Sequence, residues 1–212
     1  MNPDQGHLTL RQKLARTSLV VLVLLTSFLI PFTYTLFSAN DGYGLSANRP
    51  APHFSLKDAQ GTEVSLSDLH GKYVFLMFGY MNCRDICHSQ ALIFQEINKL
   101  ADMDNRLSFL YITMDPGRDS AEQLVAYFDR RADNFTSLRS ENIAYLQEVA
   151  SAYRAFFARG PNLPAGDYEV EHPGLYFLIG PEGKLRYTYT ASQTRSDLIV
   201  EDLMKIKNER DV

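Results

Sequence analysis

Residues 79–88 read Gly-Tyr-Met-Asn-Cys-Arg-Asp-Ile-Cys-His and hold both cysteines of the chain, Cys83 and Cys87. An apolar run of β type, residues 73–78, comes directly before this stretch, and apolar side chains recur at helical spacing after it. The pattern predicts that the cysteines lie where a buried strand ends and a helix begins. Because a helix N-terminus carries partial positive charge, it favours the thiolate form of both side chains. Two thiolates on such a turn can bind a soft metal ion or close into a disulfide.

The spacing of the two cysteines separates two kinds of site. Thiol–disulfide exchange sites of the thioredoxin type usually read C-x-x-C, whereas this pair has the spacing C-x-x-x-C. The longer spacing lets the two sulfurs bracket a metal ion without strain. A structural disulfide is the alternative, although a bridge between near neighbours closes a short loop and stabilises little. Two cysteines alone exclude a disulfide framework and a four-cysteine zinc site.

Composition sets the size and the class of the protein. The chain has 212 residues, of which 45% are hydrophobic and 22% charged. These values suit one globular domain with an ordinary core and one additional segment. The formal net charge is −4, and an acidic protein of this kind is not expected to bind nucleic acid.

The additional segment lies near the N-terminus. Residues 18–37 contain no charged side chain and are rich in Leu, Val, Ile and Phe. At about 1.5 Å of rise per residue, a helix of this length spans roughly 30 Å of hydrocarbon. The cations Arg11, Lys13 and Arg16 precede the apolar run, and no Lys or Arg follows it before Arg49. The positive-inside rule therefore predicts a cytoplasmic N-terminus and an exported remainder.

This reasoning divides the chain into four parts. We expect a cytoplasmic N-terminus over residues 1–17, a transmembrane anchor over 18–37, a polar linker over 38–50 and a folded domain over 51–212. A cleaved signal peptide is the alternative to the anchor, but its apolar core would be unusually long and its cleavage pattern poor.

The exported domain alternates strands and helices after an initial hairpin. The predicted strands are residues 51–56, 62–66, 73–78, 107–113, 135–138, 175–179 and 185–190. The predicted helices start at the cysteine pair, cover residues 121–131 and 142–158, and start again at Ser196, while residues 159–167 form a loop. Such alternation implies a parallel core sheet, to which hairpins add antiparallel strands. The predicted fold class is α/β: a thioredoxin-like fold with an N-terminal β-hairpin and a helical insertion, preceded by one transmembrane helix.

A metal site needs a third ligand besides the two sulfurs. Five histidines are available: His7, His53, His70, His88 and His172. His7 precedes the anchor and lies on the wrong side of the membrane. His88 adjoins Cys87 and is a spare candidate, although a solvated helix position is the simpler interpretation. His172 stands in a loop directly before an apolar strand, and in a thioredoxin-like sheet that loop faces the cysteine helix.

Four stretches of the chain resemble one known family. The run from Gly79 to Cys87 resembles the copper-binding motif of the Sco family (SenC/PrrC), the copper chaperones of cytochrome c oxidase assembly. Three further stretches agree with that family in the same order: Thr113-Met-Asp-Pro-Gly-Arg-Asp-Ser120, Val149-Ala-Ser-Ala-Tyr153 and Tyr168-Glu-Val-Glu-His172. The resemblance extends over residues 51–203, and the combination is more specific than any one stretch.

The resemblance implies a copper site. It makes Cys83, Cys87 and His172 the metal ligands and puts Asp115 beside the site, where it would support a ligand rather than bind copper. Two thiolates and one imidazole suit Cu(I), with Cu(II) as an alternative, whereas zinc normally takes a fourth ligand. The sequence departs from the family at Arg84 and His88, which stand where the family usually has proline.

Three functions follow from the resemblance and the cysteine pair. The first is a membrane-anchored metallochaperone, not an enzyme, that delivers copper to the binuclear copper site of a cytochrome c oxidase subunit. The second is a thiol–disulfide oxidoreductase that reduces the cysteines of that subunit, and the third is a copper or redox sensor. The expected partners are the oxidase subunit and other copper chaperones or thiol oxidoreductases. The expected location is a bacterial inner membrane with the domain in the periplasm, or the mitochondrial inner membrane facing the intermembrane space.

Overall fold

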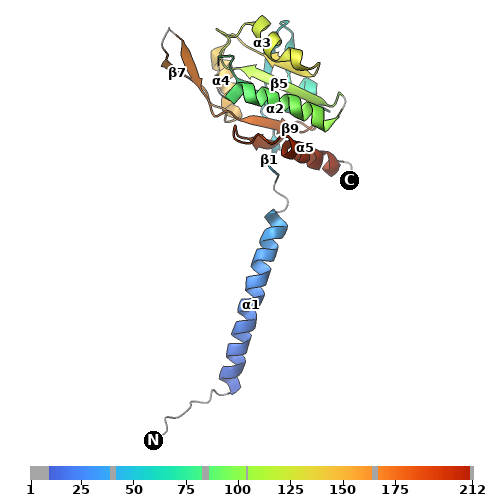
Figure 1. Ribbon diagram of the computed structural model, residues 1–212, viewed down its shortest axis with the longest axis vertical. Coiled ribbons are helices and arrows are strands. Elements are labelled where there is room, and N and C mark those ends of the chain that lie inside the picture. Colours follow the sequence, from blue (N-terminus) through green and yellow to red (C-terminus); the bar gives the residue numbers. More distant parts are fainter. Residues whose placement is uncertain (1–9, 39–41, 83–85, 104, 164–166, 211–212) are drawn as a thin grey trace. The chain divides into compact units, whose positions relative to one another are not determined.

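The computed structural model describes residues 10–38, 42–82, 86–103, 105–163 and 167–210 (Figure 1). The chain forms two compact units, Met1–Asp41 and Gly42–Val212. The described residues of the first unit form the helix α1 (Leu10–Ser38), and Pro31 lies inside it. Residues Leu14–Thr33 make a helix that is long and apolar enough to cross a membrane, and their side chains are exposed. The predicted apolar helix is confirmed, and α1 extends beyond its predicted bounds at both ends.

The second unit is built on a six-stranded mixed sheet. Its strand order is β1-β10-β9-β4-β5-β6. The strands are β1 (Leu45–Pro50), β4 (Tyr73–Gly79), β5 (Leu107–Thr113), β6 (Phe135–Leu138), β9 (Tyr176–Ile179) and β10 (Lys184–Tyr189). Strands β4, β5 and β6 run parallel, and β9, β10 and β1 add antiparallel pairs. The predicted combination of a parallel core with antiparallel additions is confirmed.

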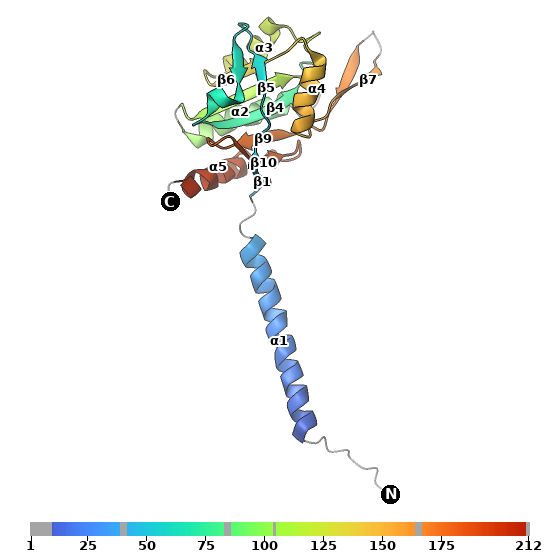
Figure 2. The same cartoon turned by 180° about the vertical axis from the view of Figure 1, so that it is seen from behind.

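Helices cover both faces of this sheet. They are α2 (Ile86–Ala101), α3 (Ala121–Tyr127), α4 (Ile143–Ala152) and α5 (Ser196–Arg210), with short 3-10 turns η1 (Leu66–Leu69) and η2 (Asp129–Arg131). Helices α2 and α5 contact each other on one face, and α4 lies on the opposite face (Figures 1 and 2). Because both faces are covered, every residue of β4 and of β5 is buried. This explains why the two strands read as mostly apolar runs rather than as alternating patterns.

Aromatic side chains form the centre of the core beneath α2. The rings of Phe75 and Phe109 stack at 5.2 Å between centroids, and Phe94 of α2 lies 5.3 Å from Phe109 and 5.7 Å from Phe75. Aromatic pairs at such separations contribute beyond the area that they bury. They hold α2 against β4 and β5.

The predicted N-terminal hairpin is confirmed, with shorter strands. Strand β2 (Ser55–Lys57) pairs antiparallel with β3 (Glu63–Ser65). The turn between them is closed by Asp58, whose carboxylate accepts hydrogen bonds from the backbone N–H groups of Gln60 and Thr62 at 2.9 and 2.8 Å.

The structure differs from the prediction of a linker up to residue 50. Strand β1 occupies Leu45–Pro50 and pairs with β10, with an irregularity between Ser46 and Arg49. The hydrophobic pattern of the sequence did not predict strand β1, for two reasons. It is an edge strand in which half of the residues are polar, and its pairing comes from backbone hydrogen bonds. In addition, Asn48 adopts a left-handed conformation (φ 37°) of the kind seen at bulges.

The predicted helix over residues 142–158 is too long, and the predicted loop over 159–167 contains a strand. Helix α4 ends at Ala152, and Arg154 turns the chain with a φ of 61°. Strand β7 (Ala158–Asn162) then pairs antiparallel with β8 (Tyr168–Glu171). The apolar spacing was misleading because Phe156, which fits it, is 62% exposed. Gly and Pro within β7 are tolerated since this hairpin is separate from the main sheet.

Candidate metal centre

The cysteine segment begins after the end of β4 at Gly79 and runs into the first turn of α2, which starts at Ile86. This confirms the predicted strand–turn–helix setting. Cys87 is the second residue of α2, but its side chain, and Cys83 altogether, lie outside the described residues. The alternative that the two cysteines form a disulfide therefore also concerns atoms outside the described residues. Among the described residues, no three His, Cys, Asp or Glu side chains form a group able to hold a metal ion.

His172 follows the end of β8 and is half-buried. Its Nδ1 lies 2.9 Å from the carbonyl oxygen of Val170. Since a carbonyl can only accept, Nδ1 carries the proton in this contact, and Nε2 keeps the lone pair that a metal ion requires. The imidazole packs edge-on against the ring of Tyr80, with 5.7 Å between centroids. The structure therefore places the His172 ring against a residue three positions before Cys83.

Asp115 lies in the loop after β5 and is only 6% exposed. Its carboxylate accepts a hydrogen bond from the hydroxyl of Tyr168 at 2.8 Å and forms an ion pair with Nε of Arg118. Its own backbone N–H donates to the hydroxyl of Thr113 at 3.0 Å. Asp115 thus acts on Tyr168, the first residue of β8, four positions before His172.

Arg118 has a role that the sequence pattern did not reveal. Its guanidinium donates to Asp115, to Asp167 and, at 2.9 Å, to the backbone carbonyl of Tyr168. The guanidinium carbon also lies 3.5 Å from the centroid of the Tyr168 ring. Burial opposes the charge, but the hydrogen bond to Asp115 and the neighbouring acidic groups outweigh it and raise the pKa of Arg118. In the sequence, Arg118 is one residue of the stretch from Thr113 to Ser120, and no pattern there distinguishes it.

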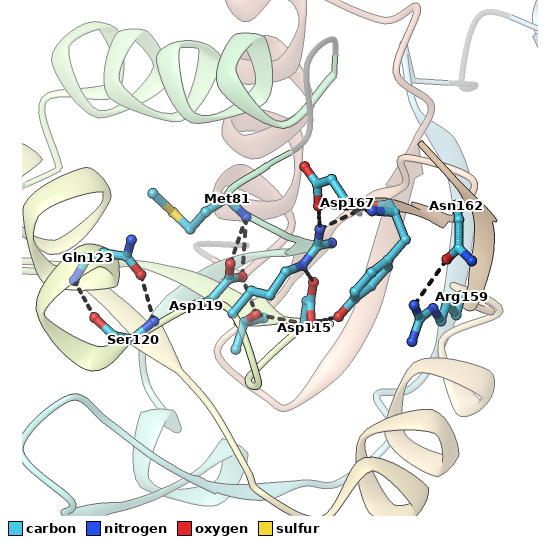
Figure 3. Close-up of polar contacts among 11 residues, drawn as sticks. Met81, Asp115, Asp119, Ser120, Gln123, Arg159, Asn162 and Asp167 are labelled. Carbon is cyan, nitrogen blue, oxygen red and sulfur yellow. Dashed lines mark hydrogen bonds and ion pairs between the residues drawn. The ribbon is translucent and has the colours of Figure 1, made fainter. Parts of the chain in front are cut away.

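Asp119 is a second residue that sequence reasoning missed, and it is buried to 1% exposure. Both carboxylate oxygens lie 3.2 Å from the backbone nitrogen of Met81, and one accepts the hydroxyl of Thr113 at 2.5 Å (Figure 3). Burial raises the pKa of Asp119 to about 6, although these hydrogen bonds oppose the rise. The Met81 contact fixes the backbone two residues before Cys83.

The fold and this arrangement define a class of protein: a thioredoxin-like domain with a C-x-x-x-C pair at the first strand–helix junction and a histidine beside that turn. The SCO1/SenC family model matches residues 44–208. The chain belongs to the SCO1/SenC family, which confirms the resemblance drawn from its motifs.

Relatives and solved structures agree with this assignment. Mitochondrial SCO1 of Saccharomyces cerevisiae is 34% identical over 156 residues, which are 69% of this chain and 50% of that protein. A putative copper-binding protein of Stutzerimonas stutzeri is 32% identical over 147 residues, 67% of this chain and 70% of that protein. The solution structure of apo Sco1 from Thermus thermophilus has a TM-score of 0.68 at 26% identity, covering 78% of this chain and 97% of the other. Yeast Sco1 with copper bound has a TM-score of 0.61 at 30% identity, covering 74% and 89%. The chain spans about half the length of the mitochondrial relatives.

Proposed function

We propose that this protein is a membrane-anchored copper-binding protein that delivers copper to the binuclear copper site of cytochrome c oxidase during assembly. The observation that carries the proposal is the contact between the His172 ring and Tyr80, on the segment that leads to the two cysteines. Relatives in the family support it, because one is named as copper-binding and yeast Sco1 has been solved with copper bound. Copper is the cargo of such a protein, and the oxidase subunit is its acceptor.

The donor set suits copper. We assign Cys83, Cys87 and His172 as the ligands. Two soft thiolates favour Cu(I) over harder cations, and an imidazole is a common ligand of copper. The Nδ1 contact with Val170 fixes the His172 ring in the tautomer whose Nε2 can bind a metal. Asp115 supports the site through Tyr168.

A thiol–disulfide oxidoreductase is the second candidate function. The observation in its favour is the position of Cys87 in the first turn of α2, since a helix N-terminus stabilises a thiolate. In that case the protein would reduce the cysteines of the oxidase subunit before copper enters. His172 would then have no part in the chemistry, because thiol–disulfide exchange needs only an attacking thiolate and a disulfide.

Anaerobic copper titration of the reduced chain in detergent tests the proposal, together with a measurement of its dithiol–disulfide reduction potential. We expect about one Cu(I) per chain, because three soft ligands fill one trigonal site. Failure to retain copper during gel filtration, with a potential in the range of thiol reductants, would favour the oxidoreductase instead.

The domain is expected on the outer side of the membrane, joined to its anchor. The reason is the apolar helix α1, with Arg11, Lys13 and Arg16 before its charge-free stretch. Protease added to the outer face of intact spheroplasts should release a soluble fragment that binds copper. Sequencing the N-terminus of the mature protein is the second measurement, and a start near Asn40 would show a cleaved signal peptide instead.

A further inference from the structure

One loop contacts both segments from which the proposed copper ligands come. Residues 114–120 form the β5–α3 loop, which connects β5 to α3. The loop is closed on itself, because the backbone N–H groups of Arg118 and Asp119 donate to the carbonyl of Asp115 at 3.1 and 2.9 Å. It is also tied to the end of β4, where Met114 N–H donates to the Gly79 carbonyl at 2.8 Å. The loop is therefore a fixed element between the two segments.

On the cysteine side, the loop acts through Asp119. Its carboxylate holds the Met81 backbone N–H, and Thr113 holds the carboxylate in turn (Figure 3). A carboxylate that accepts a backbone N–H from a buried position fixes the direction of that peptide group. The turn that leads to Cys83 is thereby anchored to the β5–α3 loop.

On the histidine side, the loop acts through Arg118. The guanidinium bonds Asp115 within the loop, and beyond the loop it bonds the Asp167 carboxylate and the Tyr168 carbonyl. It also covers the Tyr168 ring, whose hydroxyl donates to Asp115. Arg118 thus holds the start of β8 at three points: the ring of Tyr168, the backbone carbonyl of Tyr168 and the carboxylate of Asp167.

Strand β8 transmits this position to His172. The strand is only four residues long, Tyr168–Glu171, and His172 follows it directly. Val170 within it is buried to 5% exposure, and its carbonyl accepts from the His172 Nδ1. A shift of β8 at Tyr168 would therefore move both the backbone of His172 and the group that orients its ring.

We propose that Arg118 is a positioning residue that holds β8, and with it His172, at a set place relative to the cysteine turn. This inference rests on the proposed function for its copper readout, but the position of β8 can be measured without copper. Arginine suits the role because its planar fork forms directional bonds to several acceptors at once, which a lysine ammonium cannot reproduce.

The chain offers a matched control for this proposal. Arg159 also lies over the Tyr168 ring, with its guanidinium carbon 4.0 Å from the centroid. It is exposed and donates to Asn162 on its own strand. Arg118→Lys and Arg159→Lys are thus the same substitution over the same ring, and only the first removes the fork that joins β8 to the loop.

The test uses the reduced full chain in detergent and compares wild type, Arg118→Lys and Arg159→Lys. Two quantities are measured: hydrogen–deuterium exchange of the copper-free protein over residues 168–172, and Cu(I) affinity by competition with a chromogenic chelator. We expect Arg118→Lys to exchange at least about tenfold faster in this segment and to bind copper about 10–100-fold more weakly. In a separate sample loaded with Cu(II), the thiolate-to-Cu(II) absorption band should also shift, since its energy depends on ligand geometry.

Arg159→Lys should stay within about twofold of wild type in both quantities. Equal effects of the two substitutions, or wild-type exchange and affinity in Arg118→Lys, would overturn the proposal. Should Arg118→Lys fail to fold, Tyr168→Phe removes only the hydroxyl bond to Asp115, and it should change exchange and affinity in the same direction to a smaller extent. If the wild type binds no copper, the proposed function fails, while the exchange data still decide whether Arg118 holds β8.

Discussion

Replacing Cys87 with alanine should abolish tight copper binding. The change leaves one thiolate and one imidazole, and a two-ligand site of that kind holds Cu(I) far less well than a three-ligand site. Losing a ligand should exceed the 10–100-fold cost that is typical of losing a group that merely orients one, so we expect more than about 100-fold weaker binding. Copper analysis after gel filtration of the reduced protein measures this directly.

His88 supplies the control for this substitution. It adjoins Cys87 in α2 and carries a side chain able to bind copper, but it is not assigned as a ligand. His88→Ala should therefore retain the wild-type stoichiometry. Wild-type copper content in Cys87→Ala would show that Cys87 is not a copper ligand and would overturn the proposed site. Loss of copper in His88→Ala would show that His88 is a ligand.

Replacing His172 with alanine should separate the two candidate functions. The imidazole fills the third position around copper, so copper affinity should fall by more than the 10–100-fold typical of an orienting group. The dithiol–disulfide exchange of Cys83 and Cys87 should persist, with at most a modest change in reduction potential. Chelator competition and redox titration of the same preparation measure the two properties side by side.

His53 is the matched control for His172. Its Nδ1 also lies 2.9 Å from a backbone carbonyl, that of Phe54, but its side chain is exposed and lies in the N-terminal hairpin region. His53→Ala should bind copper as the wild type does. A copper affinity of His172→Ala equal to that of His53→Ala would exclude His172 as a ligand.

The parts of the fold that follow from hydrophobic patterning were predictable. Strands β5 and β6 have the predicted bounds, 107–113 and 135–138. Strand β5 is buried at every residue, and its mostly apolar sequence reflects the cover on both faces of the sheet. The final helix was predicted to begin at Ser196, and α5 does begin there. Patterning also located the cysteine pair at the strand–helix junction, which is a local property of the chain.

Elements held by backbone pairing or by distant charges were not predictable in this way. Strand β1 has no continuous apolar pattern, and its pairing with β10 joins residues far apart in the chain. Strand β7 begins where apolar spacing still favoured a helix. The role of Arg118 depends on Asp167 and Tyr168, which lie 49 and 50 positions away, and no spacing rule connects charges over that distance. The family resemblance in the sequence therefore indicated the proposed ligands and Asp115, but not Arg118 or Asp119.

We propose that copper held by Cys83, Cys87 and His172 is what the oxidase receives. The most direct measurement is the activity and copper content of cytochrome c oxidase from cells grown at limiting copper, with the chromosomal copy replaced by wild type, His53→Ala or His172→Ala. We predict normal oxidase with the first two and an oxidase poor in copper and activity with His172→Ala, although the thiols of that variant still exchange. Fully active, copper-replete oxidase in the His172→Ala cells would contradict the account.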